Sequence, residues 1–227
     1  VHYDANDGKS YSTKYKSEKT ALSLAVEKKN IKIVKLLLTI ESLNINIPFF
    51  KKDTFHDKIH EYRIETPLYL AINNNNNEIV KLLLTNNELD INFINTCYHI
   101  NEGTSKKTSF YCAVQRNDIE IVKLMLMNNK LDINTKNIIS GFRSFKNTLG
   151  YISYHGIEEK TALFEAIENG NIDIIILLFS HDKIDVNLTY KIDRFESNKN
   201  SKNKKIFEMN LFQFLIYRNK QEIIQLL

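Results

Sequence analysis

Histidine and cysteine are the residues of this chain whose spacing comes nearest to that of a metal site. His56 and His60 are four residues apart, which would place both side chains on one face of a helix. The residue after His56 is Asp57, however, and zinc peptidases of the H-E-x-x-H type need a glutamate there. Cys97 and His99 are also close, but no second ligand pair follows at the spacing of zinc sites. The sequence therefore predicts no metal site.

The motifs of other catalytic classes are missing from the sequence. It contains no G-x-S-x-G elbow, no phosphate-binding glycine loop and no dinucleotide fingerprint. The acidic residues have the pattern of solvated helix surfaces. We therefore expect a protein that is not an enzyme and that carries no cofactor.

The composition predicts a single folded domain over residues 1–227. Of the 227 residues 43% are hydrophobic, which is enough to bury a core, and 6 glycines and 2 prolines leave few breaks between independent units. No apolar run is long enough to span a membrane, and the polar start is unlike a signal peptide. Because the sequence does not begin with methionine, we expect a piece of a longer protein. Two cysteines, Cys97 and Cys112, are too few for a disulfide framework, which favours a cytoplasmic location.

The chain is built from copies of a 27-residue pattern. The copy TPLYLAINNNNNEIVKLLLTNNELDIN illustrates it: a threonine, an apolar segment, a polar break, a second apolar segment and a final asparagine. Repetition at a fixed register is typical of stacked repeat proteins. The complete copies are residues 20–46, 66–92, 108–134 and 161–187, and a partial copy is 210–227.

Each copy predicts two helices with a break between them. The initial threonine is a good N-cap, because its hydroxyl accepts a hydrogen bond from a free N–H group of the first turn. Nine residues later, all copies but the first have asparagine or glycine, which adopt the left-handed backbone that ends a helix most easily. Beyond this break, apolar residues recur at helical spacing. The residues at the break are Lys29, Asn75, Asn117, Gly170 and Asn219.

A helix pair of this size cannot bury its apolar face alone, so neighbouring copies must stack. An alanine recurs at one position of the first helix, where a small side chain allows helices to approach closely. The sequence therefore predicts an all-α fold, a solenoid of stacked helix pairs. The recurrent alanines are Ala25, Ala71, Ala113 and Ala166.

The copies resemble the ankyrin repeat, whose pattern includes T-P-L-H-x-A and a final Asp-Val-Asn. TPLYLA at 66–71, IVKLLL at 79–84 and DVN at 185–187 carry the resemblance most clearly. Two departures are systematic. Successive threonines lie 46, 42 and 53 residues apart, against about 33 in the family. Other residues also replace the family's histidine, namely Ser23, Tyr69, Tyr111 and Phe164.

The additional residues form insertions in the connections, or fingers, between the copies. These are residues 47–65, 93–107, 135–160 and 188–209. Apolar and polar residues alternate in parts of them, and several aromatic residues are present, which predicts ordered β-hairpins projecting from the solenoid. The exception is Ser197–Lys205, whose composition predicts a mobile segment.

The resemblance implies that the fingers and the first helices line a concave groove that binds another protein or a peptide. Tyr69, Tyr111 and Phe164 are ambiguous, because they would equally well pack between repeats. The residues before each threonine, Lys19, Glu65, Lys107 and Lys160, belong to the same surface. The candidate binding residues are Lys28, Tyr69, Asn73, Asn74, Tyr111, Gln115, Arg116, Phe164, Glu168 and Asn169.

The alternative is a polyanion-binding protein, using the basic stretch at residues 199–205. The net charge is +4, and most of the excess lies in residues 188–209. A nucleic-acid surface would need cations along successive repeats, since affinity comes from neutralising phosphates. Residues just before the helix breaks are of mixed type instead, as Glu27–Lys28 and Glu168–Asn169 show. The pattern favours a protein partner over nucleic acid. The basic stretch includes Lys199, Lys202, Lys204 and Lys205.

Overall fold

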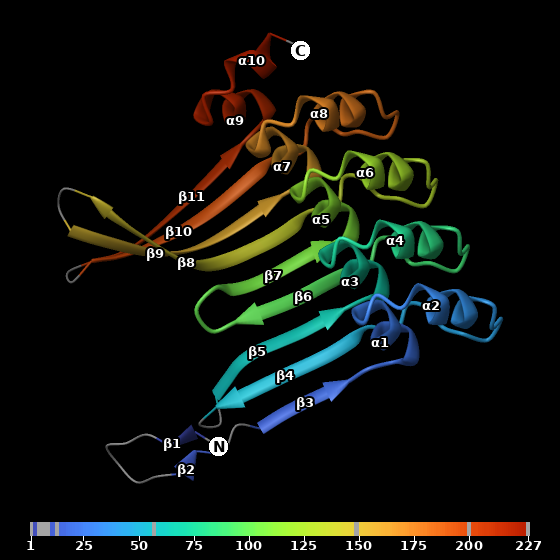
Figure 1. Ribbon diagram of the computed structural model, residues 1–227. Helices are drawn as coiled ribbons and strands as arrows, with labels where there is room; N and C mark the ends of the chain where they lie inside the picture. The colour runs from blue at the N-terminus through green and yellow to red at the C-terminus, as the bar shows by residue number, and fades with distance from the viewer. Residues whose placement is uncertain are drawn as a thin grey trace.

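The computed structural model describes residues 2–3, 10–11, 14–55, 58–147, 150–198 and 201–225. Five helix pairs stack along one axis, and a large antiparallel sheet extends from one side of the stack (Figure 1). The first helix of each pair lies next to the sheet and the second lies on the far side. The pairs are α1 (Ala21–Glu27) and α2 (Ile31–Leu38), α3 (Pro67–Asn73) and α4 (Asn77–Leu84), α5 (Ser109–Gln115) and α6 (Ile119–Leu126), α7 (Ala162–Asn169) and α8 (Ile172–Phe179), and α9 (Leu211–Tyr217) and α10 (Gln221–Ile224).

The predicted starts and ends of the first helices are largely confirmed. Thr20, Thr66 and Thr108 each accept a hydrogen bond from the backbone N–H three residues later, whereas Thr161 makes no such bond. All five predicted break residues have positive φ: Lys29 54°, Asn75 52°, Asn117 56°, Gly170 70° and Asn219 53°. A left-handed residue at each break lets the chain reverse into the second helix.

The second helices begin with a cap that the repeat pattern also contains. Asn30, Asn76, Asp118 and Asn171 accept hydrogen bonds from the N–H groups of Ile33, Ile79, Ile121 and Ile174. A side-chain oxygen at this position satisfies one of the free N–H groups of the first turn.

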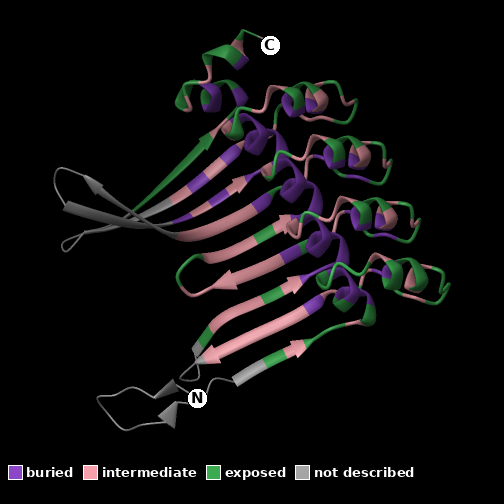
Figure 2. Ribbon diagram, viewed as in Figure 1, coloured by how far each residue is buried: buried purple, intermediate pink, exposed green. Residues whose placement is uncertain are grey.

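The core runs continuously through the stack. Ala71, Ala113 and Ala166 have no exposed surface, and apolar residues of the second helices, such as Leu83, are equally buried. Figure 2 shows that buried residues concentrate in the first helices and in the strand ends next to them. In the last repeat, the second residue after the N-cap is open to solvent. Phe212 at this position of α9 is 57% exposed, whereas Leu163 at the same position of α7 is 2% exposed.

The prediction of an all-α solenoid is wrong. Each finger forms a hairpin, as expected, but the hairpins pair with one another into a nine-stranded antiparallel sheet, in the order β11-β10-β9-β8-β7-β6-β5-β4-β3. The strands are β3 (Lys14–Glu18), β4 (Phe49–Phe55), β5 (Lys58–Glu65), β6 (Ile94–His99), β7 (Gly103–Thr108), β8 (Asn137–Asn147), β9 (Gly150–Lys160), β10 (Tyr190–Asn198) and β11 (Ser201–Met209); β1 (His2–Tyr3) and β2 (Ser10–Tyr11) form a separate pair.

The physical reason for the sheet is the state of the hairpin edges. An isolated two-stranded hairpin leaves N–H and C=O groups unpaired along both edges and is marginally stable in water. Stacking the helix pairs brings successive hairpins side by side, and β5 then pairs with β6, β7 with β8, and β9 with β10. The fingers are thus parts of one sheet rather than separate projections.

Of the segment predicted to be mobile, Ser197–Lys205, the described residues lie in the strands β10 and β11, and its mobility stays a prediction. β10 and β11 remain paired up to Asn198 and Ser201 at the end of the hairpin. Lys199 lies outside the described residues. Within the described part of the chain, no helix has the length and apolar character that crossing a membrane requires.

Candidate functional site

The first helices and the sheet meet in an inner corner that runs the length of the stack. In the first four repeats the residue before the threonine lies at or next to the end of the strand that leads into the first helix. In the first, third and fourth repeats it contacts the seventh residue after the threonine. Lys19 Nζ donates to Glu27 Oε2 at 2.7 Å, and Lys107 Nζ donates to Gln115 Oε1 at 2.9 Å. We call these positions the corner residues: Lys19, Glu27, Glu65, Asn73, Lys107, Gln115, Lys160 and Glu168.

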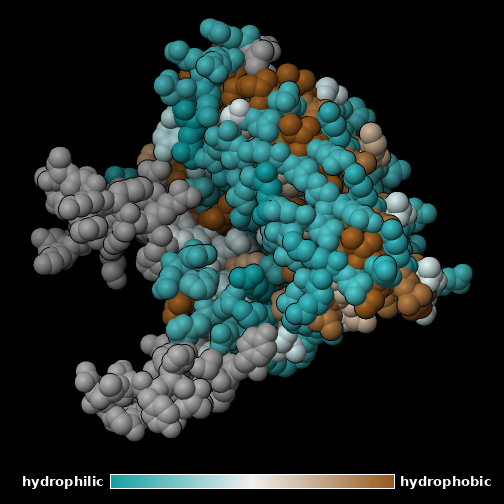
Figure 3. Space-filling model, viewed as in Figure 1, coloured by the Kyte–Doolittle hydropathy of each residue, from teal (hydrophilic) through white to brown (hydrophobic). Residues whose placement is uncertain are grey.

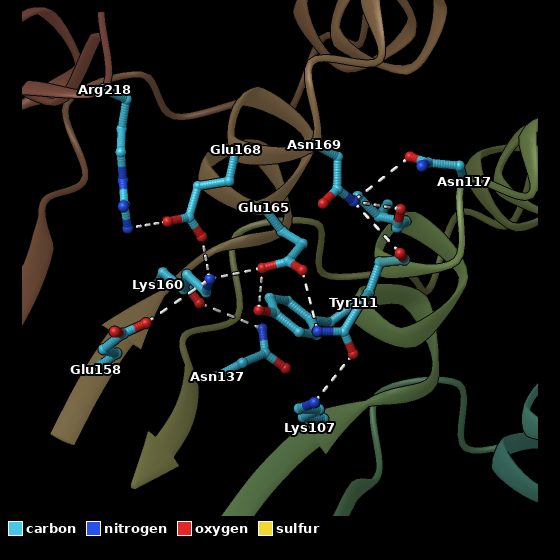
Figure 4. Close-up of polar contacts among 12 residues, drawn as sticks. Lys107, Tyr111, Asn117, Asn137, Glu158, Lys160, Glu165, Glu168, Asn169 and Arg218 are labelled. Atoms are coloured by element: carbon cyan, nitrogen blue, oxygen red, sulfur yellow. Dashed lines mark hydrogen bonds and ion pairs between the residues drawn. The ribbon is translucent and has the colours of Figure 1, made fainter. Parts of the chain in front are cut away.

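Lys160 is the most buried cation of the corner, with 5% of its surface exposed. Its Nζ lies 2.7 Å from Glu165 Oε2 and 3.8 Å from Glu158 Oε2, and it also pairs with Glu168 (Figure 4). Burial disfavours the charged amine, but the carboxylates of Glu165 and Glu168 outweigh it and raise the pKa of Lys160. The ammonium therefore stays charged inside the protein.

Glu165 links this cluster to the preceding repeat. It accepts hydrogen bonds from the Tyr111 hydroxyl and from Gln115 Nε2, the latter at 3.0 Å (Figure 4). Burial opposes its ionisation, yet Lys160 and the hydrogen bonds lower its pKa below the ordinary value. Arg218 of the last repeat pairs with Glu168. One polar network thus connects the last three repeats.

The two thiols lie near the corner of the second and third repeats. Cys97 Sγ donates to Glu65 Oε1 at 3.1 Å, and Cys112 Sγ donates to Asn73 Oδ1 at 3.0 Å. Burial raises the pKa of Cys97 to about 12 and that of Cys112 to about 11. Because the thiolate is the nucleophilic form, these protonated thiols are poor nucleophiles.

The structure divides the candidate binding residues into two groups. Tyr69, Tyr111 and Phe164 are 5%, 0% and 1% exposed, so they pack between repeats and are not part of the free surface. Phe164 packs edge-to-face on Phe214 with ring centroids 4.9 Å apart. The corner holds Asn73, Gln115 and Glu168, and the turns between helices hold Lys28, Asn74, Arg116 and Asn169.

The turn residues also make contacts between repeats. Arg116 donates to Asn75 Oδ1 of the preceding turn. Asn169 Nδ2 lies 3.4 Å from Asn117 Oδ1 in the same way (Figure 4). Among the described residues, no hydrogen bond or ion pair joins the side chains of Lys28 and Asn74 to a partner, so they are the freer members of this row.

Sequence analysis missed two buried asparagines that position the corner. Asn95 Oδ1 accepts from Thr66 N at 2.7 Å, and Asn137 Oδ1 accepts from Thr108 N at 2.8 Å. Each is 1% exposed and follows the last aspartate of its copy by five residues. In the first and fourth copies, Phe49 and Tyr190 stand at this position. The signal that could have found these residues is the asparagine that the second and third copies share at this position.

A cavity of about 460 Å³ lies where β5, β6, β7 and β8 approach the corner. Its lining is mainly polar and includes Arg63, Cys97, Ser105 and Lys107. Over the residues that the structure describes, no three His, Cys, Asp or Glu side chains are grouped to hold a metal ion. His56 lies outside those residues.

Comparison with known proteins identifies the repeat. A family description of ankyrin repeats, in three copies, matches residues 50–137, a range that includes two of the four complete copies. No curated protein matches the chain. The central region of this chain, residues 50–137, is therefore similar to ankyrin repeats, as the resemblance of the copies predicted.

Proposed function

We propose that this chain is a protein-binding module, that it has no enzymatic activity, and that its partner lies along the inner corner. Ankyrin repeats generally mediate protein–protein interactions and are typically non-enzymatic. The observation that carries the proposal is the corner itself, a polar surface that continues from repeat to repeat. Because the paired hairpins hold one wall of this surface in place, little ordering remains to be done on binding.

Charge argues against the polyanion alternative. Lys204 Nζ lies 3.4 Å from Asp193 Oδ2, so an acidic neighbour already offsets part of the basic stretch. Lys191 of the same hairpin likewise lies 3.9 Å from Glu159 Oε1. Nucleic-acid affinity depends on cations that are free to neutralise phosphates. The corner likewise mixes acids with bases. A protein surface of mixed charge fits this pattern better than a phosphate backbone.

The test is capture of partners by the tagged chain, followed by mass spectrometry. The corner variant is Lys28→Glu with Asn74→Arg, at the turn positions next in sequence to the corner residues Glu27 and Asn73. The control is Lys123→Glu with Asn129→Arg, which makes the same charge change on exposed residues away from the corner. We expect the corner variant to lose a set of proteins that the control retains, with both melting temperatures unchanged. Capture that is equal for both variants, or that consists of nucleic acid and disappears in moderate salt, would overturn the proposal.

A further inference from the structure

Three repeats place a lysine at the same corner position, and one of the three differs from the others in its surroundings. Lys19 pairs with Glu27 at 2.7 Å, and Lys160 pairs with Glu165 at 2.7 Å and with two further carboxylates. Lys107 has the amide oxygen of Gln115 at 2.9 Å and the Tyr111 ring at 5.7 Å. Among the described residues, no carboxylate lies within 4.0 Å of its Nζ.

Lys107 also lines the cavity between the hairpins. At about 460 Å³ the cavity has the volume of roughly 15 water molecules at about 30 Å³ each, which is ample for an amino-acid side chain. Ser105 and Thr104 add hydroxyl groups to its lining. Of the three lysines at this corner position, Lys107 is thus the one without a carboxylate partner among the described residues, and it is also the one that lines the cavity.

The other cation that lines the cavity, Arg63, already has a carboxylate partner. Arg63 pairs with Glu61, which Lys51 also contacts at 2.5 Å. Glu65 accepts a hydrogen bond from Cys97, and burial raises its pKa. Glu102, at the rim, is exposed. Among the described residues that line the cavity, Lys107 is thus the lysine or arginine without a carboxylate partner, and a partly buried cation of this kind is stabilised by a carboxylate.

We propose that this cavity receives an aspartate or glutamate side chain of the partner protein, and that the carboxylate forms an ion pair with Lys107 Nζ. The inference rests on the proposed function and specifies its chemistry. The partner's carboxylate then pairs with Lys107 in the third repeat, as Glu27 pairs with Lys19 in the first and Glu165 pairs with Lys160 in the fourth. Charge-assisted contacts of this kind in a hollow are favoured positions for interface energy.

The first experiment uses N-acetylglutamate N-methylamide as the probe and the glutamine analogue as its neutral match. NMR of uniformly labelled chain, which reports lysine side chains and backbone amides alike, is recorded at probe concentrations up to about 100 mM, the range that a single charge-assisted contact requires. We expect a saturable shift of the Lys107 signal with the acidic probe alone. Lys107→Gln should abolish the shifts at Cys97 and Ser105, and Lys106→Gln, which removes an exposed neighbouring lysine, should leave them unchanged.

Several results would overturn the inference: no saturation with the acidic probe, equal shifts with the neutral probe, or shifts that persist in Lys107→Gln. Inorganic phosphate binding more tightly than the acidic probe would favour a polyanion instead. In partner capture, Lys107→Gln should weaken retention at least about tenfold. If Lys107→Gln retains the partner and the corner variant loses it, the inference is refuted and the proposed function stands. If the natural chain captures no partner, the result counts against the proposed function, and the probe titration still tests the cavity.

Discussion

Lys160 and Lys107 occupy equivalent positions but differ in what surrounds the amine. Replacing Lys160 with methionine would leave three nearby carboxylates without their cation, and breaking a buried pair in this way costs about 3–5 kcal/mol. Lys107→Gln removes a cation that has no carboxylate partner, so its unfolding free energy should change by less than about 1 kcal/mol. Urea denaturation of both variants measures this difference. Similar losses in the two variants would show that the network around Lys160 does not act as described.

The ionisation of Glu165 predicts a pH dependence of stability. Its pKa in the folded protein is lowered from 4.5, so its contribution is present above the unfolded pKa and is lost as the pH falls through the folded pKa. Unfolding free energies measured from about pH 6 down to about pH 3 should therefore fall more steeply for the natural chain than for Glu165→Gln. Glu88→Gln, at an exposed position, should follow the natural chain. Parallel curves for all three proteins would contradict this assignment.

Asn95 tests the role of the buried asparagines. Asn95→Ala leaves the buried N–H of Thr66 without its acceptor, and an unsatisfied buried donor costs about 1–3 kcal/mol. Asn87→Ala, on an exposed side chain, should cost less than about 0.5 kcal/mol. Thermal or urea denaturation distinguishes the two. Equal stabilities would mean that water replaces the asparagine at no cost.

At the scale of elements, the sequence predicted the helices well and the sheet poorly. The helices are local: a threonine cap, an apolar pattern and a left-handed break all lie within 27 residues, so even Lys29 could be assigned to its break. The sheet depends on contacts between repeats. β7 has the sequence GTSKKT, which contains no large apolar residue and no strand pattern. It is a strand because β6 and β8 lie on either side of it.

In the candidate site, too, local features could be predicted from the sequence, whereas contacts between repeats could not. The repeat register identified Lys107 and Lys160 as equivalent residues, and both lie in the corner. Their partners could not be assigned, since Glu165 reaches Tyr111 of the preceding repeat and Asn95 reaches Thr66 across a strand. Such contacts depend on how the repeats pack on one another, which a single copy does not encode.

Two glycines allow the hairpins to approach where β7 meets β8. A Cβ added at Gly141 would lie 2.4 Å from the carbonyl oxygen of Glu102, and one added at Gly103 would lie 2.1 Å from that of Ser140. Gly141→Val should therefore separate the two strands locally. We expect hydrogen exchange at Ser105 and Lys106 to accelerate at least about tenfold while the amides of α3 and α6 keep their protection. Unchanged exchange in β7 would show that the backbone adjusts without loss of pairing.

For the whole molecule, the stack predicts that identical positions differ in energy according to their neighbours. Leu163 of α7 is 2% exposed, whereas Phe212 at the same position of α9 is 57% exposed. Leu163→Ala should cost about 2–5 kcal/mol. Phe212→Ala should cost less than about 1 kcal/mol despite the larger side chain, because this residue is already largely exposed. Denaturant unfolding of the two variants decides the matter, and equal costs would be inconsistent with stability that depends on nearest neighbours.

Apolar side chains are exposed near both ends of the stack while a hydrophilic surface covers most of the face between them (Figure 3). Ile33 and Leu36 of α2 are 45% and 67% exposed at one end, and Ile216 of α9 is 69% exposed at the other. The equivalent isoleucine of the second repeat, Ile79, is completely buried. The exposure at the ends thus follows from position in the array rather than from any change in the repeat pattern.

The sheet also sets the distance at which the repeats can stack. Neighbouring strands lie about 4.8 Å apart, so a two-stranded finger advances roughly 10 Å, and packed helices are separated by roughly 8–10 Å. One hairpin per helix pair therefore matches the spacing of the strands to that of the helices. A single strand per repeat would be narrower than the helix spacing, and three strands would be wider. Fingers of different lengths are all accommodated, because additional residues lengthen a strand without changing the number of strands across the sheet. The length of a finger can therefore vary from repeat to repeat, whereas each finger must contribute two strands to the sheet.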